Sequence, residues 1–567
     1  MRTGRTGNID HQTRLTVSLG TAALLLGACA PASPTPAAPA SAPAPASAPA
    51  APAPLAPKQG GTLVYAPIKP TTSLHPYVGA SDVDFLRGVG PAYESLISFK
   101  YEPGKDWRDT MEAVPWLAES WELPDKTTYV FRLRQGIKWH DGEELTAQDV
   151  VKTYTWMLDP KAGVRKREQV APAQSIEAVD RYAVRITTKE PSALFLQNLA
   201  DDNLFILPAR HLDGGTDFNK TVIGTGPFKL KSFTANKETV WERHAAYWQE
   251  GRPYLDGIKA IWGLDNAAMQ AAFRTSQNDL VAFEDKAQFD AFVKTKPETL
   301  YLKTLTETGN AFYPKIDRPP FDDVRVRRAL HLAVDREAMV KTLTFGLGAA
   351  NLPFVPGWMK AWAIPDEEVA RTPGYRQPKD QDVAEARRLL QEAGLGSGFR
   401  VKMTYNTGSP LPRNIAEMLP EQARKVNIEI QLDPQEAGAF SKIDADGSFD
   451  AVLTGDLSRS DLPGKIRERL HSKGRVNNLG AKDEKLDRML DAFPTYFDEK
   501  ERKQKALEIQ RYLLEQLYGI PTIEFASFIA WQPWVHDYVH RGGVAVIVAQ
   551  HSVSRLWLDT EKVPQGR

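Results

Sequence analysis

Strand patterns and helix patterns alternate along most of the chain after residue 60. Residues 128–133 (TYVFRL) alternate polar and apolar side chains, as a half-buried strand does. A helical pattern begins at Leu145, where Thr146 and Asp149 have the spacing of a capping box. Such alternation is typical of α/β architecture. Because 567 residues are too many for one ordinary hydrophobic core, the sequence predicts an α/β protein with two or more domains.

The remaining elements follow from the same patterns, and the sequence shows no repeat of fixed period. Further strands are expected at 62–65, 184–188, 240–242, 257–262, 428–432 and 449–453. Further helices are expected at 265–274, 322–344, 382–392, 411–426 and 483–516.

The first thirty residues have the order of a secretory signal peptide. Three arginines precede an apolar run at 15–26, which is too short for a stable membrane span. The segment Leu26-Gly27-Ala28-Cys29 then resembles the lipobox of bacterial lipoproteins. This resemblance implies a signal peptide at 1–28, cleavage before Cys29 and lipidation of the Cys29 thiol, which would anchor the protein to a membrane. The alternative is a signal peptide with an incidental cysteine.

A tract of alanine, proline and serine joins this start to the first strand pattern. Residues 30–57 carry no charged side chain, and their prolines interrupt any helix. Such a composition cannot bury a core. We therefore expect residues 29–57 to be a lipidated cysteine followed by a semi-rigid tether. A Pro-rich recognition ligand is the alternative interpretation.

Composition excludes several classes of function. Lysine plus arginine equals aspartate plus glutamate, at 71 each, so no basic excess is available to hold nucleic acid. The single cysteine excludes a disulfide scaffold, a CxxC redox centre and a four-cysteine zinc site. No apolar run reaches the roughly 18 residues of a transmembrane helix. No Walker A sequence occurs, so we expect no ATP hydrolysis by this chain.

Two segments superficially suggest chemistry. His140 to Glu144 contain metal-ligand residue types in one turn, but four donors this close cannot all reach one ion without strain. We expect a turn and a helix start there instead. Ser397 lacks the glycines that a nucleophile elbow needs two residues before and two after the serine. The sequence therefore predicts no catalytic residue, no metal and no cofactor.

Segments along nearly the whole chain after the tether resemble the family 5 extracytoplasmic solute-binding proteins of ABC importers, the dipeptide- and oligopeptide-binding type. The most specific segment is 131–154 (FRLRQGIKWHDGEELTAQDVVKTY). Others, in chain order, are GGTL at 60–63, YESL at 93–96, IGTGPF at 223–228, YW at 247–248 and PFDDVRVRRAL at 320–330.

The resemblance implies a type II periplasmic-binding-protein fold, in which two α/β lobes enclose a cleft and a third domain is inserted near the N-terminus. Carried onto this chain, lobe one would comprise 58–90, 223–305 and 530–567. The inserted domain would be 91–222, and lobe two would be 306–529. The crossings near 305 and 530 would form the hinge.

The resemblance also implies a function. Such a protein captures a peptide or similar small solute in the periplasm or at the cell surface and delivers it to ABC permease subunits. We expect a monomer that is anchored to the membrane by lipid, performs no covalent chemistry and binds no nucleic acid. A sensory protein that presents its ligand to a receptor is an alternative, and so is a secreted hydrolase.

The resemblance implies ligand contacts at three places. Asp456 matches an aspartate that pairs with the α-ammonium of a bound peptide, with Asp461 as the alternative position. Arg459 either neutralises Asp456 or holds a carboxylate of the ligand. Loops with Thr72 and Ser73, and with Asn406, line up with loops that face the cleft.

Overall fold

The computed structural model places most of the chain after the tract of alanine, proline and serine. It describes residues 55–67, 73–77, 89–101, 111–164, 166–201, 204–213, 215–283, 285–305, 309–355, 359–408, 410–455, 462, 464–474, 476–539 and 550–565. The chain divides into a unit of residues 1–56 and a unit of residues 57–567, and the description below concerns the second unit. The predictions for Cys29, Thr72, Asp456, Arg459 and Asp461 lie outside the described residues.

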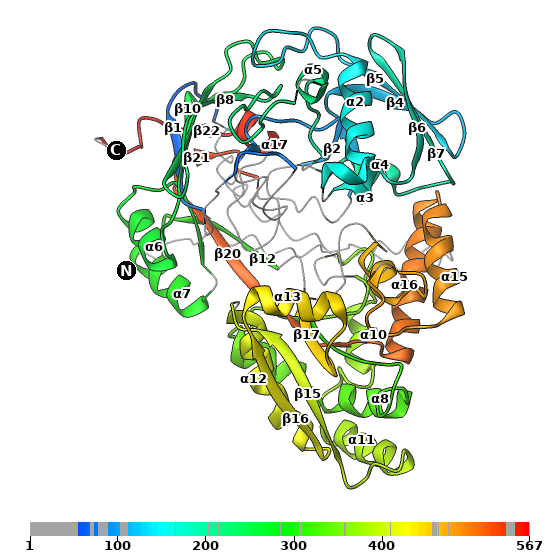
Figure 1. The fold of residues 1–567 in the computed structure, drawn as a ribbon. Helices are drawn as coiled ribbons and strands as arrows, with labels where there is room; N and C mark the ends of the chain where they lie inside the picture. Colours follow the sequence, from blue (N-terminus) through cyan, green and yellow to red (C-terminus); the bar gives the residue numbers. More distant parts are fainter. Residues whose placement is uncertain are drawn as a thin grey trace, which may run out of the picture. The chain divides into compact units, whose positions relative to one another are not determined.

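The largest sheet combines strands from distant parts of the chain (Figure 1). Its order is β12 (Leu300–Leu305), β20 (Ala526–Trp531), β11 (Leu280–Phe283), β1 (Thr62–Tyr65), β10 (Gly257–Ile261), β9 (Glu238–Arg243) and β8 (Phe228–Thr234). The central strand β1 runs parallel to β10 and β11. Helices α6 (Asn266–Arg274) and α7 (Lys286–Thr295) supply Phe273, Phe289 and Phe292 to the core on this sheet.

A second sheet has five strands and a separate core. Its order is β16 (Ile428–Gln435), β15 (Phe399–Asn406), β17 (Ala451–Gly455), β13 (Asn310–Pro314) and β18 (Ile520–Pro521). Strand β15 runs parallel to both β16 and β17. Helices α8 (Val324–Ala333), α11 (Asp380–Glu392) and α12 (Pro410–Arg424) place buried apolar side chains in the core with these strands. Helix α13 (Ala437–Asp446) contacts β15 from the segment between β16 and β17.

A third, four-stranded sheet is formed entirely within residues 118–188. Its order is β4 (Ala118–Glu122), β5 (Thr128–Leu133), β7 (Ala183–Thr188) and β6 (Ala173–Asp180), and α2 (Ala147–Leu158) contacts it. The predicted capping pair is present at the start of α2. Asp149 is 5% exposed, and its carboxylate accepts hydrogen bonds from the backbone N–H groups of Thr146 and Ala209, both at 2.8 Å. One buried carboxylate thus caps the helix and ties it to the segment that follows the sheet.

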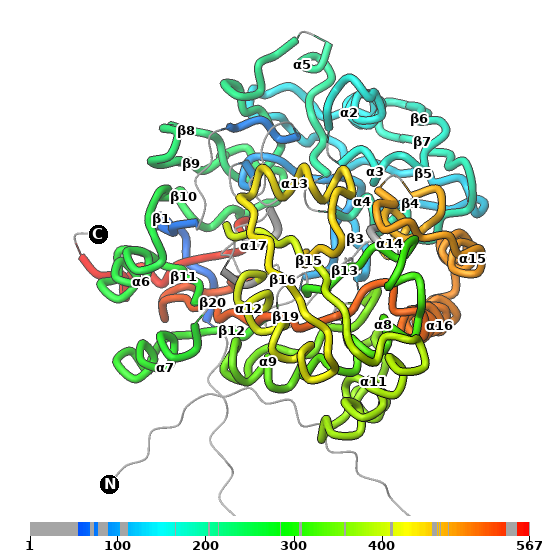
Figure 2. The backbone as a smooth tube through the Cα atoms, turned by 60° about the horizontal axis from the view of Figure 1, so that its bottom comes forward, coloured from blue at the N-terminus to red at the C-terminus, as the bar shows by residue number. Residues whose placement is uncertain are grey.

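Two adjacent chain connections join the seven-stranded and five-stranded sheets. Leu305 pairs with Ala526 at the end of the first sheet, and Ala311 pairs with Pro521 in the second. Between them, the Asn310 carbonyl accepts hydrogen bonds from Thr522 N at 2.8 Å and Thr522 Oγ1 at 2.7 Å. Strands β12, β19 (Ile523–Glu524) and β20 lie near one another at this place (Figure 2).

The second connection precedes β20, close to the crossing that was expected near 530. Residues 526–529 belong to β20 in the seven-stranded sheet, whereas the sequence analysis assigned them to lobe two and placed the crossing near 530. The pattern ASFIAW is apolar except for Ser527, so the sequence does not show which sheet receives it. The other lobe bounds stay predictions.

Two predicted long helices are each broken. The pattern at 322–344 forms α8 and α9 (Arg336–Leu343), because Val334 is extended and Asp335 caps the second helix by accepting from Ala338 N at 3.0 Å. The pattern at 483–516 forms α15 (Glu484–Ala492), a 3-10 turn at Phe493–Thr495 and α16 (Glu499–Gln516). Pro494 cannot continue the first of these helices, and Asp498 caps the second. The other predicted strands and helices are confirmed to within a few residues.

Candidate ligand-binding site

The carboxyl ends of the parallel strands in the five-stranded sheet mark one candidate site. Strands β15 and β17 run in the same direction and end at Asn406 and Gly455. Gly455 pairs with Asn310, where the chain enters from the seven-stranded sheet. In open α/β sheets, ligands bind outside the carboxyl ends of the strands. The two loops that the sequence analysis singled out after 406 and 455 therefore begin at the same edge, beside the connections between the sheets.

Asn406 is engaged by its own loop. Its side-chain oxygen accepts a hydrogen bond from Gly408 N at 2.8 Å, and Thr407 N donates to the Gln435 carbonyl at 2.9 Å. These bonds fix the loop against the end of β16. A contact between Asn406 and a ligand stays a prediction.

Ser73 lies in a different environment, on the segment that follows β1. Its hydroxyl donates to Asn219 Oδ1 at 2.5 Å and accepts from His75 N at 3.1 Å. Asn219 belongs to the stretch predicted as the inserted domain, so Ser73 links that stretch to the segment that follows β1. Its predicted role at the ligand is likewise untested.

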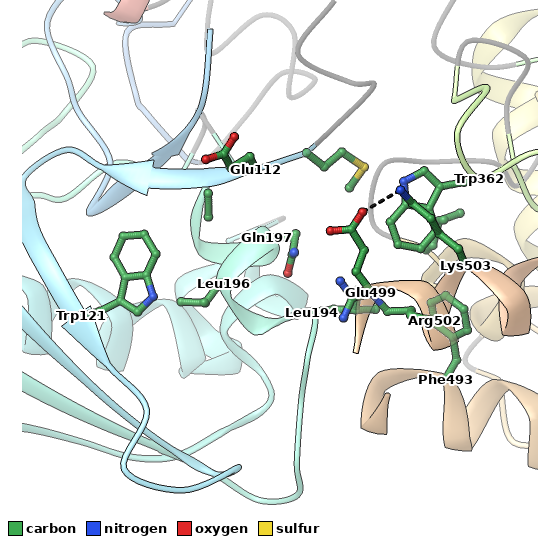
Figure 3. A pocket seen from close by; sticks show the side chains of 13 residues that line it. Glu112, Trp121, Leu194, Leu196, Gln197, Trp362, Phe493, Glu499, Arg502 and Lys503 are labelled. Atoms are coloured by element: carbon green, nitrogen blue, oxygen red, sulfur yellow. Dashed lines mark ion pairs between the residues drawn. The ribbon is translucent and has the colours of Figure 1, made fainter. Parts of the chain in front are cut away.

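A cavity of about 420 Å³ lies between residues from the predicted inserted domain and residues from the predicted lobe two (Figure 3). One wall comes from β3 (Ala113–Pro115) and its preceding residues, from β4 and from the start of α4 (Phe195–Leu199). The other comes from α16, the 3-10 turn before it, Trp362 and Leu462. This volume is within the usual range for small-molecule sites. Leu462 lines the cavity and directly follows the loop predicted to contact ligand.

The break between α15 and α16 helps to form this cavity. It places fully buried Phe493 in the wall and exposes the Pro494 carbonyl to Ala193 N, which donates to it at 2.7 Å. Nearby, Lys126 Nζ lies 5.6 Å from the centroid of the Phe497 ring. These two contacts hold the wall residues on either side together.

The charged groups of the cavity are unevenly paired. Glu499 pairs with Lys503 at 2.6 Å, and Glu112 pairs with Lys100 at 3.2 Å. Arg502 is 6% exposed and donates from Nη1 to the Tyr496 carbonyl at 2.9 Å. Burial lowers the pKa of Arg502, but a guanidinium remains charged at any physiological pH. No carboxylate forms an ion pair with Arg502 among the residues that the structure describes.

A second polar cluster surrounds Glu94, which is fully buried. Its carboxylate accepts hydrogen bonds from Trp116 Nε1 at 3.0 Å, Thr225 Oγ1 at 2.8 Å, Tyr247 OH at 2.8 Å and Trp248 Nε1 at 3.0 Å. Burial raises the pKa of Glu94 to about 7, although the four hydrogen bonds favour the charged form. Glu94, Thr225 and Trp248 come from three of the motifs that carry the family resemblance. The structure shows that these motifs meet at one buried carboxyl group.

The His140 segment packs against Gly224 and Gly226, just before the start of β8. His140 Nε2 lies 3.0 Å from the Gly226 carbonyl, and His140 N donates to the Gly224 carbonyl at 2.9 Å. Burial lowers the pKa of His140 to about 3, so the ring is neutral. Asp141 pairs with Arg210 instead of with His140. Among the described residues, no group of three or more histidine, cysteine, aspartate or glutamate side chains is arranged to hold a metal ion.

The sequence analysis missed both the cavity and the Glu94 cluster. The cavity draws on residues near 112, 121, 196, 362, 462 and 500, and no local spacing connects them. The motifs around Glu94 were visible as text, but their meeting point depends on the fold.

Two α/β sheets joined by two adjacent connections, with a third sheet inserted, define the class of two-lobed, type II periplasmic binding proteins with an extra domain. Solved structures of that class agree. HbpA2 from Haemophilus parasuis has a TM-score of 0.74 at 23% identity, covering 88% of this chain and 100% of that one. The periplasmic binding protein DppA from Helicobacter pylori, in complex with the peptide STSA, has a TM-score of 0.71 at 22% identity, covering 88% and 99%.

The family follows from the sequence match. Residues 112–478 match the model of the bacterial extracellular solute-binding proteins, family 5, and the chain belongs to this family. Curated relatives include heme-binding protein A from Haemophilus influenzae, which is 26% identical over 93% of this chain and 96% of its own length. The dipeptide-binding protein of Escherichia coli is 27% identical over 70% of this chain and 76% of its own length. No helix among the described residues is long and apolar enough to cross a membrane.

Proposed function

We propose that this protein is the solute-binding component of an ABC importer, and that it captures peptides or similar small solutes outside the inner membrane. The match to the family model over 112–478, on a fold of two joined α/β sheets, carries this proposal. The bound form would deliver the solute to permease subunits. Ligand would shift the protein toward the conformation that binds it better, and no covalent step is needed.

The location of the protein is part of the proposal. The lipobox-like segment at 26–29 supports lipidation of Cys29, and the tract at 30–57 supports a tether between the anchor and the binding unit. Together they support a periplasmic or cell-surface lipoprotein. We propose that it acts as a monomer, since a single binding unit can hold its ligand between its own lobes.

One observation favours a second ligand class. The Haemophilus influenzae relative, which is matched along 96% of its length, is named a heme-binding protein, while other relatives are named dipeptide- and di/tripeptide-binding proteins. Both classes of ligand carry at least one carboxylate. Peptide is the main proposal, and haem is the alternative that the same experiments distinguish.

Native mass spectrometry of the protein without its signal peptide tests the proposal. Recombinant protein should carry one small solute per chain, and denaturation should release that solute chemically unchanged. Incubation with a mixture of di- and tripeptides should then exchange the solute without shortening any peptide. Cleavage products that accumulate with time would instead indicate a hydrolase.

A further inference from the structure

The two walls of the cavity beside α16 meet at two contacts. Ala193 N donates to the Pro494 carbonyl at 2.7 Å, and Lys126 Nζ lies 5.6 Å from the centroid of the Phe497 ring. Ala193 and Lys126 belong to the predicted inserted domain, whereas Pro494 and Phe497 belong to the predicted lobe two. We call these four residues the bridge. Any motion that parts the two walls must break both of its contacts.

The inserted-domain half of the bridge is held in place by its own fold. Asp125 accepts hydrogen bonds from Thr127 N at 2.7 Å and Thr127 Oγ1 at 2.8 Å, which fix the turn that carries the bridge lysine. The buried Tyr129 donates from its hydroxyl to the Ser192 carbonyl at 2.6 Å, next to the bridge N–H. The positions of both bridge groups therefore do not depend on the facing wall.

The other half of the bridge is supported in the same way from its own side. Phe493 is fully buried, and its ring lies 5.6 Å from the Phe354 ring in an edge-to-face arrangement. Arg502 Nη1 donates to the Tyr496 carbonyl at 2.9 Å, between the two bridge residues of this wall. Because both halves are preorganised, joining them costs little conformational entropy. The bridge can then open and re-form while each wall keeps its structure.

The contacts between the predicted inserted domain and the predicted lobe one are of a different kind. Fully buried Glu94 accepts hydrogen bonds from Thr225 Oγ1 and Tyr247 OH, both at 2.8 Å, and His140 N donates to the Gly224 carbonyl at 2.9 Å. The bridge instead borders a cavity of about 420 Å³, and its lysine is exposed. Parting walls that already enclose a cavity breaks fewer packing contacts than parting a close-packed junction. We therefore expect the binding unit to open at the bridge, with residues 91–222 moving together with lobe one.

We propose that the bridge is a latch that controls the release of a bound solute. The walls part at the bridge before the solute leaves, so the bridge slows release without touching the solute. The proposal rests on the proposed function and deepens it, because it assigns a regulatory role to residues outside the predicted ligand contacts. The latch should act to the same extent on solutes of different chemistry.

Release rates of three chemically different probes test the latch. The tripeptides Ala-Ala-Ala and Ala-Phe-Ala and haem are each bound to the full binding unit, and their dissociation after dilution is followed by stopped-flow tryptophan fluorescence. Loss of a cation–π contact at an exposed site changes a rate by about two- to fivefold. Lys126→Met, which keeps the aliphatic stem and removes the charge, should accelerate release of every probe that binds by that factor. Lys126→Arg, which keeps the cation, should release each probe at the wild-type rate.

A double-mutant cycle connects the effect to the bridge. Phe497→Leu should accelerate release by a similar factor, and the double variant Lys126→Met/Phe497→Leu should be no faster than the faster single variant, because both changes remove one contact. Lys505→Met is the matched control. Lys505 Nζ lies 5.9 Å from the centroid of the Tyr496 ring, which is a contact of the same kind within the predicted lobe two. This variant should release each probe at the wild-type rate.

Hydrogen exchange gives a readout that needs no solute. The Ala193 N–H is the bridge donor, so its exchange rate in the solute-free protein reports how often the walls part. Mass spectrometry with fragmentation should show about two- to fivefold faster exchange of this amide in Lys126→Met, and the wild-type rate in Lys505→Met. Exchange of the amides in β5 should stay unchanged, which excludes a general loss of stability as the cause.

The outcomes separate the latch from the proposed function. Wild-type release rates in both Lys126→Met and Phe497→Leu would overturn the latch and leave the function intact. Acceleration confined to one of several bound probes would mean that Lys126 contacts that solute, and fully additive effects would mean that Lys126 and Phe497 act separately. Either result also overturns the latch. If the wild-type protein binds none of the three probes, the proposed ligand classes are contradicted. Exchange at Ala193 then decides the latch by itself, and an unchanged rate in Lys126→Met overturns it.

Discussion

Replacing Glu94 by glutamine should change how the stability of the protein depends on pH. Glu94 is fully buried at the meeting point of three family motifs, and its carboxylate accepts from Trp116, Thr225, Tyr247 and Trp248. Burial raises its pKa from 4.5 to about 7 in the folded protein. A pKa difference of this size between the folded and unfolded states corresponds to about 3 kcal/mol.

The sign follows from proton binding. Between pH 4.5 and about 7 the folded protein holds the Glu94 proton while the unfolded chain has lost it. The contribution of Glu94 is therefore fully present below pH 4.5 and is lost as pH rises through about 7. Because glutamine does not titrate, the free energy of unfolding of the wild type minus that of Glu94→Gln should fall by about 3 kcal/mol from pH 4.5 to pH 8.

Urea unfolding at four or more pH values, followed by tryptophan fluorescence, measures this difference. Glu250→Gln is the matched control, because Glu250 is exposed, and its difference from the wild type should stay constant across the same range. A wild-type minus Glu94→Gln difference that varies by less than about 0.5 kcal/mol would refute the reasoning. It would mean that the four hydrogen bonds compensate fully for burial of the charge.

Three further substitutions test separate parts of the account. Asp149→Asn should lower the melting temperature and reduce the free energy of unfolding by about 1–3 kcal/mol, because the buried carboxylate that accepts from Thr146 N and Ala209 N is lost. Ligand affinity measured by calorimetry should not change. Cys29→Ser should leave the protein in the soluble fraction with its signal peptide uncut or miscut, and a variant that stays in carbonate-washed membranes after normal processing would exclude lipidation. Asp456→Asn should weaken binding of a peptide with a free α-ammonium by about 2–5 kcal/mol; an affinity within about threefold of the wild type would shift that role away from Asp456.

Local patterns in the sequence predict most of the secondary structure. The strand at 62–65 and the capped helix at 147 are read from side chains within one or two turns of each other, and the structure confirms both. The two broken helices show where this reasoning fails. Apolar spacing continues across Asp335, so periodicity alone runs through the first break, whereas at the second break it stops after Phe497, before the polar run at 498–505. Pro494 and the N-cap aspartates Asp335 and Asp498 are the local signals that mark these breaks.

The candidate site is less predictable for a different reason. The family resemblance indicates loops after β15 and β17, and the structure brings the ends of those strands to one edge. The cavity beside Arg502 depends instead on a contact between Ala193 and Pro494, which are about 300 residues apart in sequence and have no shared motif. Arg502 itself reads as one of several charged residues on a polar helix. Its burial, and the lack of a carboxylate partner among the described residues, appear only when the walls of the cavity meet.

The central claim is that this protein holds a small solute without changing it chemically. A calorimetric titration of the binding unit with di- and tripeptides, followed by chromatographic recovery of each ligand, tests the claim most directly. We expect saturable binding of one ligand per chain for at least one peptide, with that peptide recovered intact after hours of incubation. Turnover of the peptide, or the absence of saturable binding to every peptide and to haem, would contradict the account.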